Sequence, residues 1–350
     1  MGFFDELKAA AIEKVKEKVK IELAELGIDL DEEDAAPEAE AADVVVSAPP
    51  EPNPPSPSFS SPDANTSFNE AAQLLWDLDA RLVPNKDYSI NVQNSKNPYH
   101  HEDAADQPLF TYVKPAVFRN RPTFTTFVAL LNNYSAHTGE TEIVTAQELE
   151  ENRAFLNEIM KTAPMKYCHQ YCIAKGATYK GEEISGSESD FKQILNSIWF
   201  DMYSRSGSCK DSSGFEHVFV GEVKSEKVSG FHNWIMFYLE ERRGNVDFRG
   251  YIKPKSKSCT AETNDDDAVL TLQFSWNGFE KFVGTSFIGV TPEFEMALYT
   301  MAFLTTSDDG ENIITLDTGC ESFDLNVKCY RYDCNTKVGT CYLEALAHYE

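Results

Sequence analysis

The stretch AVLTLQFSWNGFEKFVGTSFIGVTPEFEMALYTMAFL, residues 268–304, combines the sequence patterns of strands and of a helix. It contains two segments, AVLTLQFSW and FVGTSFIGV, in which apolar and polar residues alternate and β-branched and aromatic residues dominate, a pattern typical of strands. The segment PEFEMALYTMAFL follows with the apolar spacing of a helix. This stretch therefore predicts a domain that combines sheets with helices.

The same two patterns divide the chain after residue 67 into a helical half and a mixed half. Two more alternating segments, EHVFVGEV (216–223) and VKCYRYD (327–333), lie in the second half. We therefore predict an α+β domain over residues 67–350, with a helical lobe at 67–213 and a β-rich lobe at 214–350. The predicted helices outside the opening stretch are 69–82, 123–136, 151–163, 165–176, 190–205 and 232–244.

The first 66 residues differ in composition from the rest of the chain. Residues 1–27 are predicted to form one amphipathic helix that starts at residue 2, because apolar residues recur at helical spacing from Phe3 to Leu26. Residues 28–66 are rich in Pro, Ala, Ser and acidic residues, and they are predicted to be a disordered linker. The helix is expected to bind a protein partner, to self-associate or to lie on a membrane surface.

Composition limits the class of function. The chain has 57 Asp and Glu against 31 Lys and Arg, a formal charge of −26 with His neutral. This excess argues against a protein held on DNA by a broad basic surface. No apolar run approaches the roughly 20 residues of a membrane span, and the N-terminus lacks the apolar stretch of a signal peptide. We therefore expect a cytoplasmic protein, with peripheral membrane association through the first helix as the alternative.

Two of the seven histidines lie in similar local sequences. His217 follows Ser-Gly-Phe-Glu on a predicted strand, and His232 follows Ser-Gly-Phe directly before a predicted helix. Two histidines can exchange protons near neutral pH, because imidazole titrates there. The natural reaction is RNA transphosphorylation: one His takes the proton of a 2′-hydroxyl and the other protonates the departing 5′-oxygen. Lys281 is a candidate for stabilising the growing phosphoryl charge, although each of the three residues alone has a structural interpretation.

A metal site is the competing use of the same region. His217, Glu216, Glu222 and His232 offer nitrogen and carboxylate ligands. Glu216 and His217, however, would point to opposite faces of a strand. The sequence also holds no His-x3-His or Cys-x2-Cys pair that would support such a site.

Several long blocks resemble a known family. They include LLWDLDARLVPNKDYSINVQ, PLFTYVKPAVF, GFEHVFVGEV, GFHNWIMFYLEERRGNVDFRGYI, LTLQFSWNG and GTSFIGVTPEFEMALYTMAFL. These blocks resemble the eukaryotic EndoU family, also called XendoU, the poly(U)-preferring endoribonucleases that are distantly related to the nidoviral uridylate-specific endoribonuclease. The resemblance runs from about Ser67 to Tyr342, in order and at the family's spacing.

The resemblance implies a fold, a reaction and a set of site residues. The fold would be two α+β lobes, with the active site in a groove formed by the antiparallel sheets of the C-terminal lobe. The partner would be single-stranded RNA and not DNA, and the catalytic domain would be monomeric. The usual metal would be Mn²⁺, with Ca²⁺ as the alternative, and no organic cofactor is implied. The implied residues are His217, His232 and Lys281 for catalysis, Glu216 and Glu222 in support, Thr285 for reading uracil and Tyr342 for stacking on the base.

The predicted surroundings of the two histidines suggest different roles. The positive end of the helix after His232 disfavours imidazolium, so we predict that His232 is the general base. A carboxylate from Glu216 or Glu222 near His217 would favour its protonated form, so we predict that His217 is the general acid. The expected function is an endoribonuclease that cleaves single-stranded RNA at uridines and leaves 2′,3′-cyclic phosphate and 5′-hydroxyl ends. The alternative is a protein that binds RNA or a membrane surface through residues 2–27 without cutting.

Overall fold

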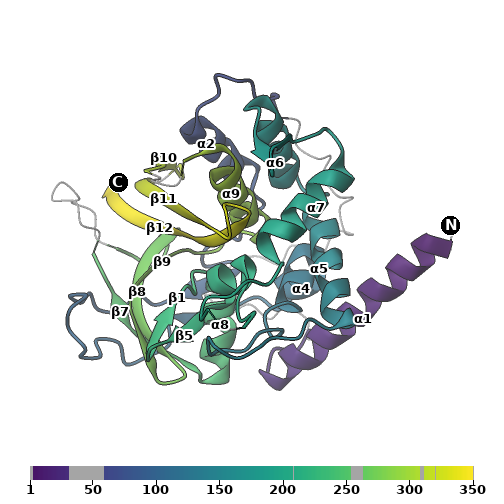
Figure 1. The fold of residues 1–350 in the computed structure, drawn as a ribbon. Helices are drawn as coiled ribbons and strands as arrows, with labels where there is room; N and C mark the ends of the chain where they lie inside the picture. Colours follow the sequence, from purple (N-terminus) through teal and green to yellow (C-terminus); the bar gives the residue numbers. More distant parts are fainter. Residues whose placement is uncertain are drawn as a thin grey trace, which may run out of the picture.

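The fold combines a helical half with a half in which sheets and helices mix. The structure is a computed structural model that describes residues 3–30, 59–207, 209–253, 263–307, 311–319 and 321–349. Its arrangement confirms the predicted α+β class (Figure 1). The helices are α1 (Phe3–Glu25), α2 (Phe68–Leu78), α3 (Ala116–Asn120), α4 (Pro122–Val128), α5 (Ala146–Ile159), α6 (Ala163–Ala174), α7 (Glu188–Trp199), the π-helical turn η1 (Glu216–Val220), α8 (Trp234–Arg243) and α9 (Pro292–Thr305).

Two sheets dominate the second half and contact each other. Five strands pair in the order β5-β6-β9-β8-β7, and three pair in the order β10-β11-β12. Strand neighbours are antiparallel, as expected, apart from a short parallel contact between β6 and β9. β12 lies against β9, so the two sheets share a boundary (Figure 1). The strands are β1 (Tyr88–Ile90), β2 (Phe110–Val113), β3 (Thr178–Tyr179), β4 (Glu182–Glu183), β5 (Glu222–Lys224), β6 (Lys227–Ser229), β7 (Val246–Tyr251), β8 (Val269–Trp276), β9 (Phe279–Phe287), β10 (Ile313–Asp317), β11 (Ser322–Tyr332) and β12 (Lys337–Tyr349).

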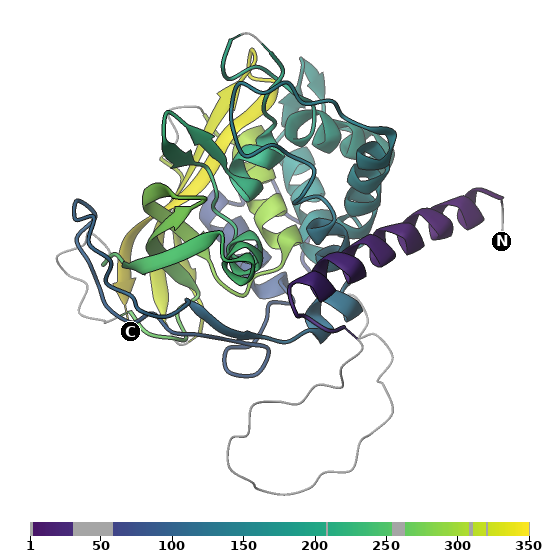
Figure 2. The ribbon, with the colours of Figure 1, turned by 90° about the horizontal axis from the view of Figure 1, so that it is seen from below.

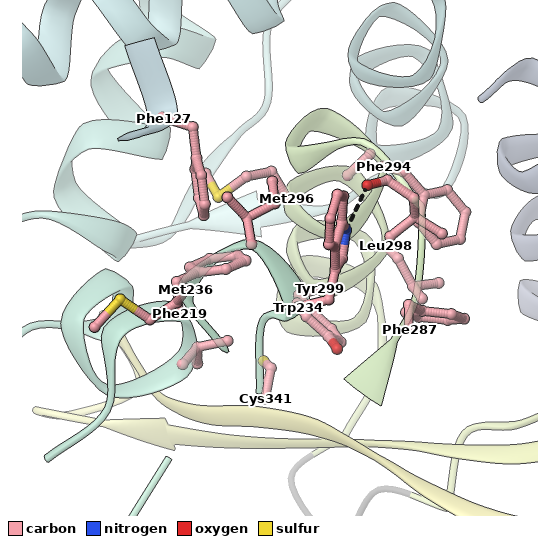
Figure 3. Packing of buried hydrophobic residues seen from close by; sticks show 14 of the residues in the cluster. Phe127, Phe219, Trp234, Met236, Phe287, Phe294, Met296, Leu298, Tyr299 and Cys341 are labelled. Carbon is pink, nitrogen blue, oxygen red and sulfur yellow. Dashed lines mark hydrogen bonds between the residues drawn. The ribbon is translucent and has the colours of Figure 1, made fainter. Parts of the chain in front are cut away.

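The apolar helix of the opening stretch forms the centre of the molecule. α9 is buried from Pro292 to Leu304, and it contacts α2, α4 and α6 of the first half as well as β11 and β12. Figure 3 shows Phe127 of α4, Trp234 of α8 and Cys341 of β12 among the side chains packed around it. The predicted lobes therefore share one hydrophobic core, and the sheets that carry the site are held by helices from both halves.

The N-terminal helix is partly integrated into the folded domain. Val15, Val19 and Leu23 are buried where α1 contacts α4 and α5. The Lys18 ammonium lies 3.0 Å from the Glu151 carboxylate on α5. The N-terminal end of α1 extends away from the body (Figures 1 and 2). The expectation that the whole helix would serve a partner, self-association or a membrane is therefore wrong for its second half, since residues four apart form a stripe that the domain itself covers.

The disordered linker predicted over residues 28–66 is contradicted at its two ends, and its central part, residues 31–58, lies outside the described residues. At one end Ile28 and Leu30 are buried. At the other end the ring of Phe59 packs edge-on against Tyr167, with 5.3 Å between centroids. Both ends therefore belong to the folded domain. Among the described helices, none combines the length and the apolar character needed to cross a membrane.

Candidate active site

A single π-helical turn carries the first histidine. Every residue of η1 is buried, so the alternation of residue types over this segment does not indicate a strand with one exposed face. The carbonyls of His217 and Val218 accept hydrogen bonds from the backbone N–H groups of Phe231 (3.1 Å) and His232 (2.9 Å). The predicted strand over 216–223 is therefore wrong, and only its end belongs to β5. The carbonyls of this segment find their partners in the loop before α8 instead of in a neighbouring strand.

A glycine allows the two histidine segments to approach so closely. Gly230 has φ of +67°, and a Cβ at this position would lie 1.7 Å from the carbonyl oxygen of His217. Only glycine combines this backbone conformation with this contact. The glycine of the Ser-Gly-Phe sequence before His232 therefore allows that loop to lie directly against η1.

The first histidine is oriented by a buried carboxylate. Nδ1 of His217 lies 2.7 Å from Oε2 of Glu222, and Nε of Arg205 lies 3.4 Å from the other oxygen of that carboxylate. Burial alone would raise the pKa of Glu222, but the hydrogen bond with His217 and the charge of Arg205 hold it below its ordinary value. The ionised carboxylate accepts the Nδ1 proton, which leaves Nε2 of His217 for chemistry.

The second histidine stands at the start of α8. Asn233 caps this helix, and its side-chain oxygen accepts the N–H groups of Ile235 and Met236, both at 3.0 Å. Nδ1 of His232 lies 3.3 Å from the carbonyl oxygen of Thr285 on β9. Because a carbonyl can only accept, Nδ1 carries the proton, and Nε2 of His232 is left as a proton acceptor.

The lysine joins the two histidine segments. Nζ of Lys281, on β9, donates to the carbonyl oxygen of Gly230 at 2.6 Å. Its side chain is buried, and burial lowers its pKa from 10.5 to about 8. The ammonium form therefore still prevails at neutral pH, which provides a positive charge beside both imidazoles.

Both histidines have lowered pKa values, and the lowering is larger at His232. Burial, and then the charges of Lys281 and His217, hold the pKa of His232 well below 6.5. Burial also lowers the pKa of His217, while the hydrogen bond to Glu222 opposes this effect. The expected influence of a carboxylate on His217 is thus present, but burial outweighs it. The direction of the difference suits a base at His232 and an acid at His217.

These side chains line one cavity between the two large sheets. Its volume is about 580 Å³, and it opens where β9 faces β12. A cavity of this size is within the range of small-molecule sites. Its walls include His217, Gly230, His232, Lys281, Thr285 and Tyr342.

The two residues implied to read the base lie on opposite walls. The hydroxyl of Thr285 is 3.0 Å from that of Thr271 on β8. The ring of Tyr342, on β12, stacks on His232 with 5.3 Å between centroids and 16° between planes. Its ring also stacks on that of Tyr330, at 6.4 Å and 22°. Tyr342 therefore lies over the imidazole that we assign as the base.

The two acids near His217 have separate surroundings. Glu216, the first residue of η1, exchanges hydrogen bonds with Ser213, three residues earlier, through both its carboxylate and its backbone N–H. Burial and the charges of Glu142 and Glu222 raise the pKa of Glu216 well above 4.5. The structure therefore brings Glu222 to the histidine and assigns Glu216 to the start of η1.

The donor set of this cavity does not fit a divalent metal ion. Within the described ranges, no three His, Cys, Asp or Glu side chains converge as a ligand group. Nδ1 of His217 is already paired with Glu222, and the Lys281 ammonium beside the imidazoles would repel a cation. The competing metal-site interpretation of His217, Glu216, Glu222 and His232 is therefore not supported. The dependence on Mn²⁺ or Ca²⁺ that the resemblance implies stays a prediction, and the described residues of this cavity supply no ligand set for either ion.

The structure adds residues that the sequence did not point to. Arg205 backs the carboxylate of Glu222, and Thr271 pairs with the hydroxyl of Thr285. Neither carries a local sequence signal, because each comes from a separate element. Gly230 could have been found, since it belongs to the Ser-Gly-Phe sequence that precedes both histidines.

Comparison with known proteins identifies the family. The family model described as Endoribonuclease XendoU matches residues 67–343. Poly(U)-specific endoribonuclease-B of Xenopus laevis is 43% identical over 284 residues, which covers 79% of this chain and 91% of the relative. Uridylate-specific endoribonuclease B of Danio rerio is 40% identical over 277 residues, with 77% of this chain and 93% of the relative covered.

A solved structure agrees with the sequence matches. It is described as XendoU, a splicing-independent snoRNA processing endoribonuclease, and it aligns with a TM-score of 0.69 at 39% identity. The alignment covers 81% of this chain and 97% of the solved one. The matched family region begins at Ser67, at the capping box of α2, so α1 lies outside it. This chain belongs to the XendoU family of endoribonucleases.

Proposed function

We propose that this protein cleaves single-stranded RNA at uridines by transphosphorylation. The observation that carries the proposal is the convergence of two imidazoles and one ammonium, His217, His232 and Lys281, on one cavity. The names of the relatives, which refer to poly(U) and uridylate, support uridine as the preferred nucleoside.

The proton transfers follow from the hydrogen bonds of the two rings. Nε2 of His232 takes the proton of the 2′-hydroxyl, whose oxygen attacks the adjacent phosphorus. Nε2 of protonated His217 gives a proton to the departing 5′-oxygen, while Glu222 stabilises the imidazolium that precedes this transfer. Lys281 stabilises the charge on the non-bridging oxygens. The products end in a 2′,3′-cyclic phosphate and a 5′-hydroxyl.

Uridine selection is assigned to the opposite walls of the cavity. The Thr285 hydroxyl and nearby backbone groups hydrogen-bond the uracil edge, and Tyr342 stacks on the base. Because Tyr342 covers His232 in this structure, binding of a uridine requires the base to displace this contact. We expect the same ring to exchange its imidazole partner for the uracil.

The test is cleavage of a labelled oligouridine, with oligodeoxyuridine as the substrate that lacks the 2′-hydroxyl. His217→Ala, His232→Ala and Lys281→Ala should each lose at least about 10²-fold in kcat, whereas His100→Ala, an exposed histidine outside the cavity walls, should retain full activity. Mass spectrometry of the fragments should show the cyclic phosphate. Cleavage of the deoxy substrate, or fragments with a 5′-phosphate, would contradict the mechanism.

Metal dependence is a separate arm of the same assay. We propose that the three side chains carry the proton transfers and the phosphoryl charge, so that any effect of Mn²⁺ or Ca²⁺ arises outside this trio. Activity should be compared with Mn²⁺, with Ca²⁺ and with a chelator. This view would be contradicted if the wild type binds Mn²⁺ and the His217→Ala variant, which keeps Lys281, does not. The ion would then lie at the imidazole of His217.

A further inference from the structure

A second and larger cavity lies beside the active site, at the turn end of the β11–β12 hairpin. Its volume is about 940 Å³. Tyr332 at the end of β11 and Lys337 at the start of β12 form one wall, and Asn152 of α5 and Asn196 of α7 form another. The proposed mechanism uses none of these residues.

Exposed aromatic rings lead from the active site to this cavity. Tyr330 stacks on Tyr342 and is 45% exposed. Tyr332, two residues further along β11, is 40% exposed and packs against Tyr203 with 4.8 Å between ring centroids. Two residues of a strand span about 6–7 Å, so the two cavities lie within reach of one extended RNA strand. Bases of any type stack on such rings.

Asn152 lines the second cavity, and the oxygen of its side chain is buried without a partner in the described part of the chain. Asn152 is 6% exposed, and its Oδ1 has no hydrogen-bond partner among the described residues. A buried acceptor without a partner is uncommon in a folded protein. An N–H group of a bound molecule would satisfy it.

The charges around the cavity favour a neutral group over a phosphate. Lys337 pairs with Asp201, and Asp333 offsets the remaining cation of the wall, Lys210. Burial raises the pKa of Glu142 to about 7, so the wall carries no net positive charge that would attract a phosphodiester. This wall therefore suits a flat, neutral molecule that stacks on an exposed ring and carries N–H donors.

We propose that this second cavity binds a nucleobase of the same RNA strand, beyond the nucleotides that are cleaved. Tyr332 stacks on the base and Asn152 accepts one of its N–H groups. This inference rests on the proposed function, and it predicts that long RNA is a better substrate than a dinucleotide.

The test compares a diuridine with a labelled oligouridine of about 20 nucleotides, longer than one binding site of this kind. Tyr332→Ala should lower the ratio of kcat/KM for long over short substrate by about 5- to 150-fold, through a raised KM for the long RNA. Tyr332→Phe, which keeps the ring, should restore the ratio to within about twofold. Asn152→Leu should lower the ratio by about 2- to 10-fold. Ile313→Ala, an exposed apolar residue on β10 of the same sheet, should leave both substrates unaffected.

Fluorescence anisotropy of the labelled RNA gives a second readout that does not depend on cleavage. Weaker binding by Tyr332→Ala that Tyr332→Phe restores supports the subsite, whether or not the wild type cleaves RNA. Absence of cleavage of both substrates by the wild type would overturn only the proposed function. An unchanged ratio and unchanged binding in Tyr332→Ala would overturn the subsite alone. Equal losses on short and long substrates would also overturn it, because the cavity would then act through the fold.

Discussion

His217 and His232 are equally buried but have different partners, and this difference separates their chemistry. His217 donates to the Glu222 carboxylate, whose pKa is held low by this hydrogen bond and by the charge of Arg205, whereas His232 donates to a backbone carbonyl. A carboxylate stabilises imidazolium more than a carbonyl does. The Lys281 charge acts on both rings in the opposite direction. The division into acid and base therefore follows from the partner of Nδ1.

Two substitutions should move the histidine pKa values in opposite directions. Lys281→Ala removes a positive charge and should raise the pKa of His232. Glu222→Gln removes the negative charge beside His217 and should lower the pKa of that ring. NMR titration of the imidazole protons measures both values, with the exposed Lys86→Ala as the control that leaves them unchanged. A fall at His232 in Lys281→Ala would refute the electrostatic coupling between these groups.

At the scale of elements, the loop before α8 and the turn η1 form one unit. Gly230→Ala forces a Cβ against the carbonyl of His217 in a left-handed conformation, so we expect a loss of at least about 10²-fold in kcat, comparable to the loss of a catalytic group. Gly244→Ala is the matched control, because Gly244 has φ of +76° with open space around its Cβ position. It should cost about 1 kcal/mol of stability and no activity. Equal activity of Gly230→Ala and Gly244→Ala would show that Gly230 is not needed to position the active site.

α1 is the second element whose role depends on packing. Leu23 is fully buried and Ile21, two residues away, is 55% exposed. Leu23→Ala should therefore lower the free energy of unfolding by about 2–5 kcal/mol, and Ile21→Ala should change it by less than about 0.5 kcal/mol. Urea unfolding followed by fluorescence measures both. Two equal and small effects would mean that α1 is not docked on α4 and α5 in solution.

The whole molecule buries several carboxyl groups in and around its shared core. Burial raises the pKa of Asp79 to about 7 and that of Glu295 to about 8. Glu295 accepts a hydrogen bond from Asn233, the residue that caps α8 beside His232. These groups stay protonated in the folded protein at pH values where the unfolded chain has lost the same protons.

Stability should consequently fall as the pH rises from about 7 to about 8. The folded state binds more protons than the unfolded state in this window. The stabilising contribution of Asp79 and Glu295 is fully present below the ordinary carboxyl pKa, and it disappears as the pH passes their raised pKa values. Thermal unfolding across this range should show a falling Tm. Glu295→Gln, which cannot ionise and still accepts from Asn233, should reduce the slope. A Tm that rises over the window would contradict the assignment of buried, protonated acids.

Most of the elements, and a candidate set of site residues, could be predicted from the amino-acid sequence. The strands within 268–290 and the helix that follows them could be predicted, because periodicity reports which faces are buried. The shared Gly-Phe context pointed to His217 and His232, and the family resemblance implied that these two residues and Lys281 form the catalytic set. Over residues 216–223 the alternating pattern wrongly predicts a strand, because a fully buried turn has no exposed face to set a period.

Which of these groups come into contact depends on packing between distant parts of the chain. It brings Glu222 to His217 and directs Glu216 to Ser213. It also docks half of α1 on the domain and places Tyr342 over His232. These contacts join residues far apart in the chain, and a local pattern records that a side chain is buried without recording which partner covers it.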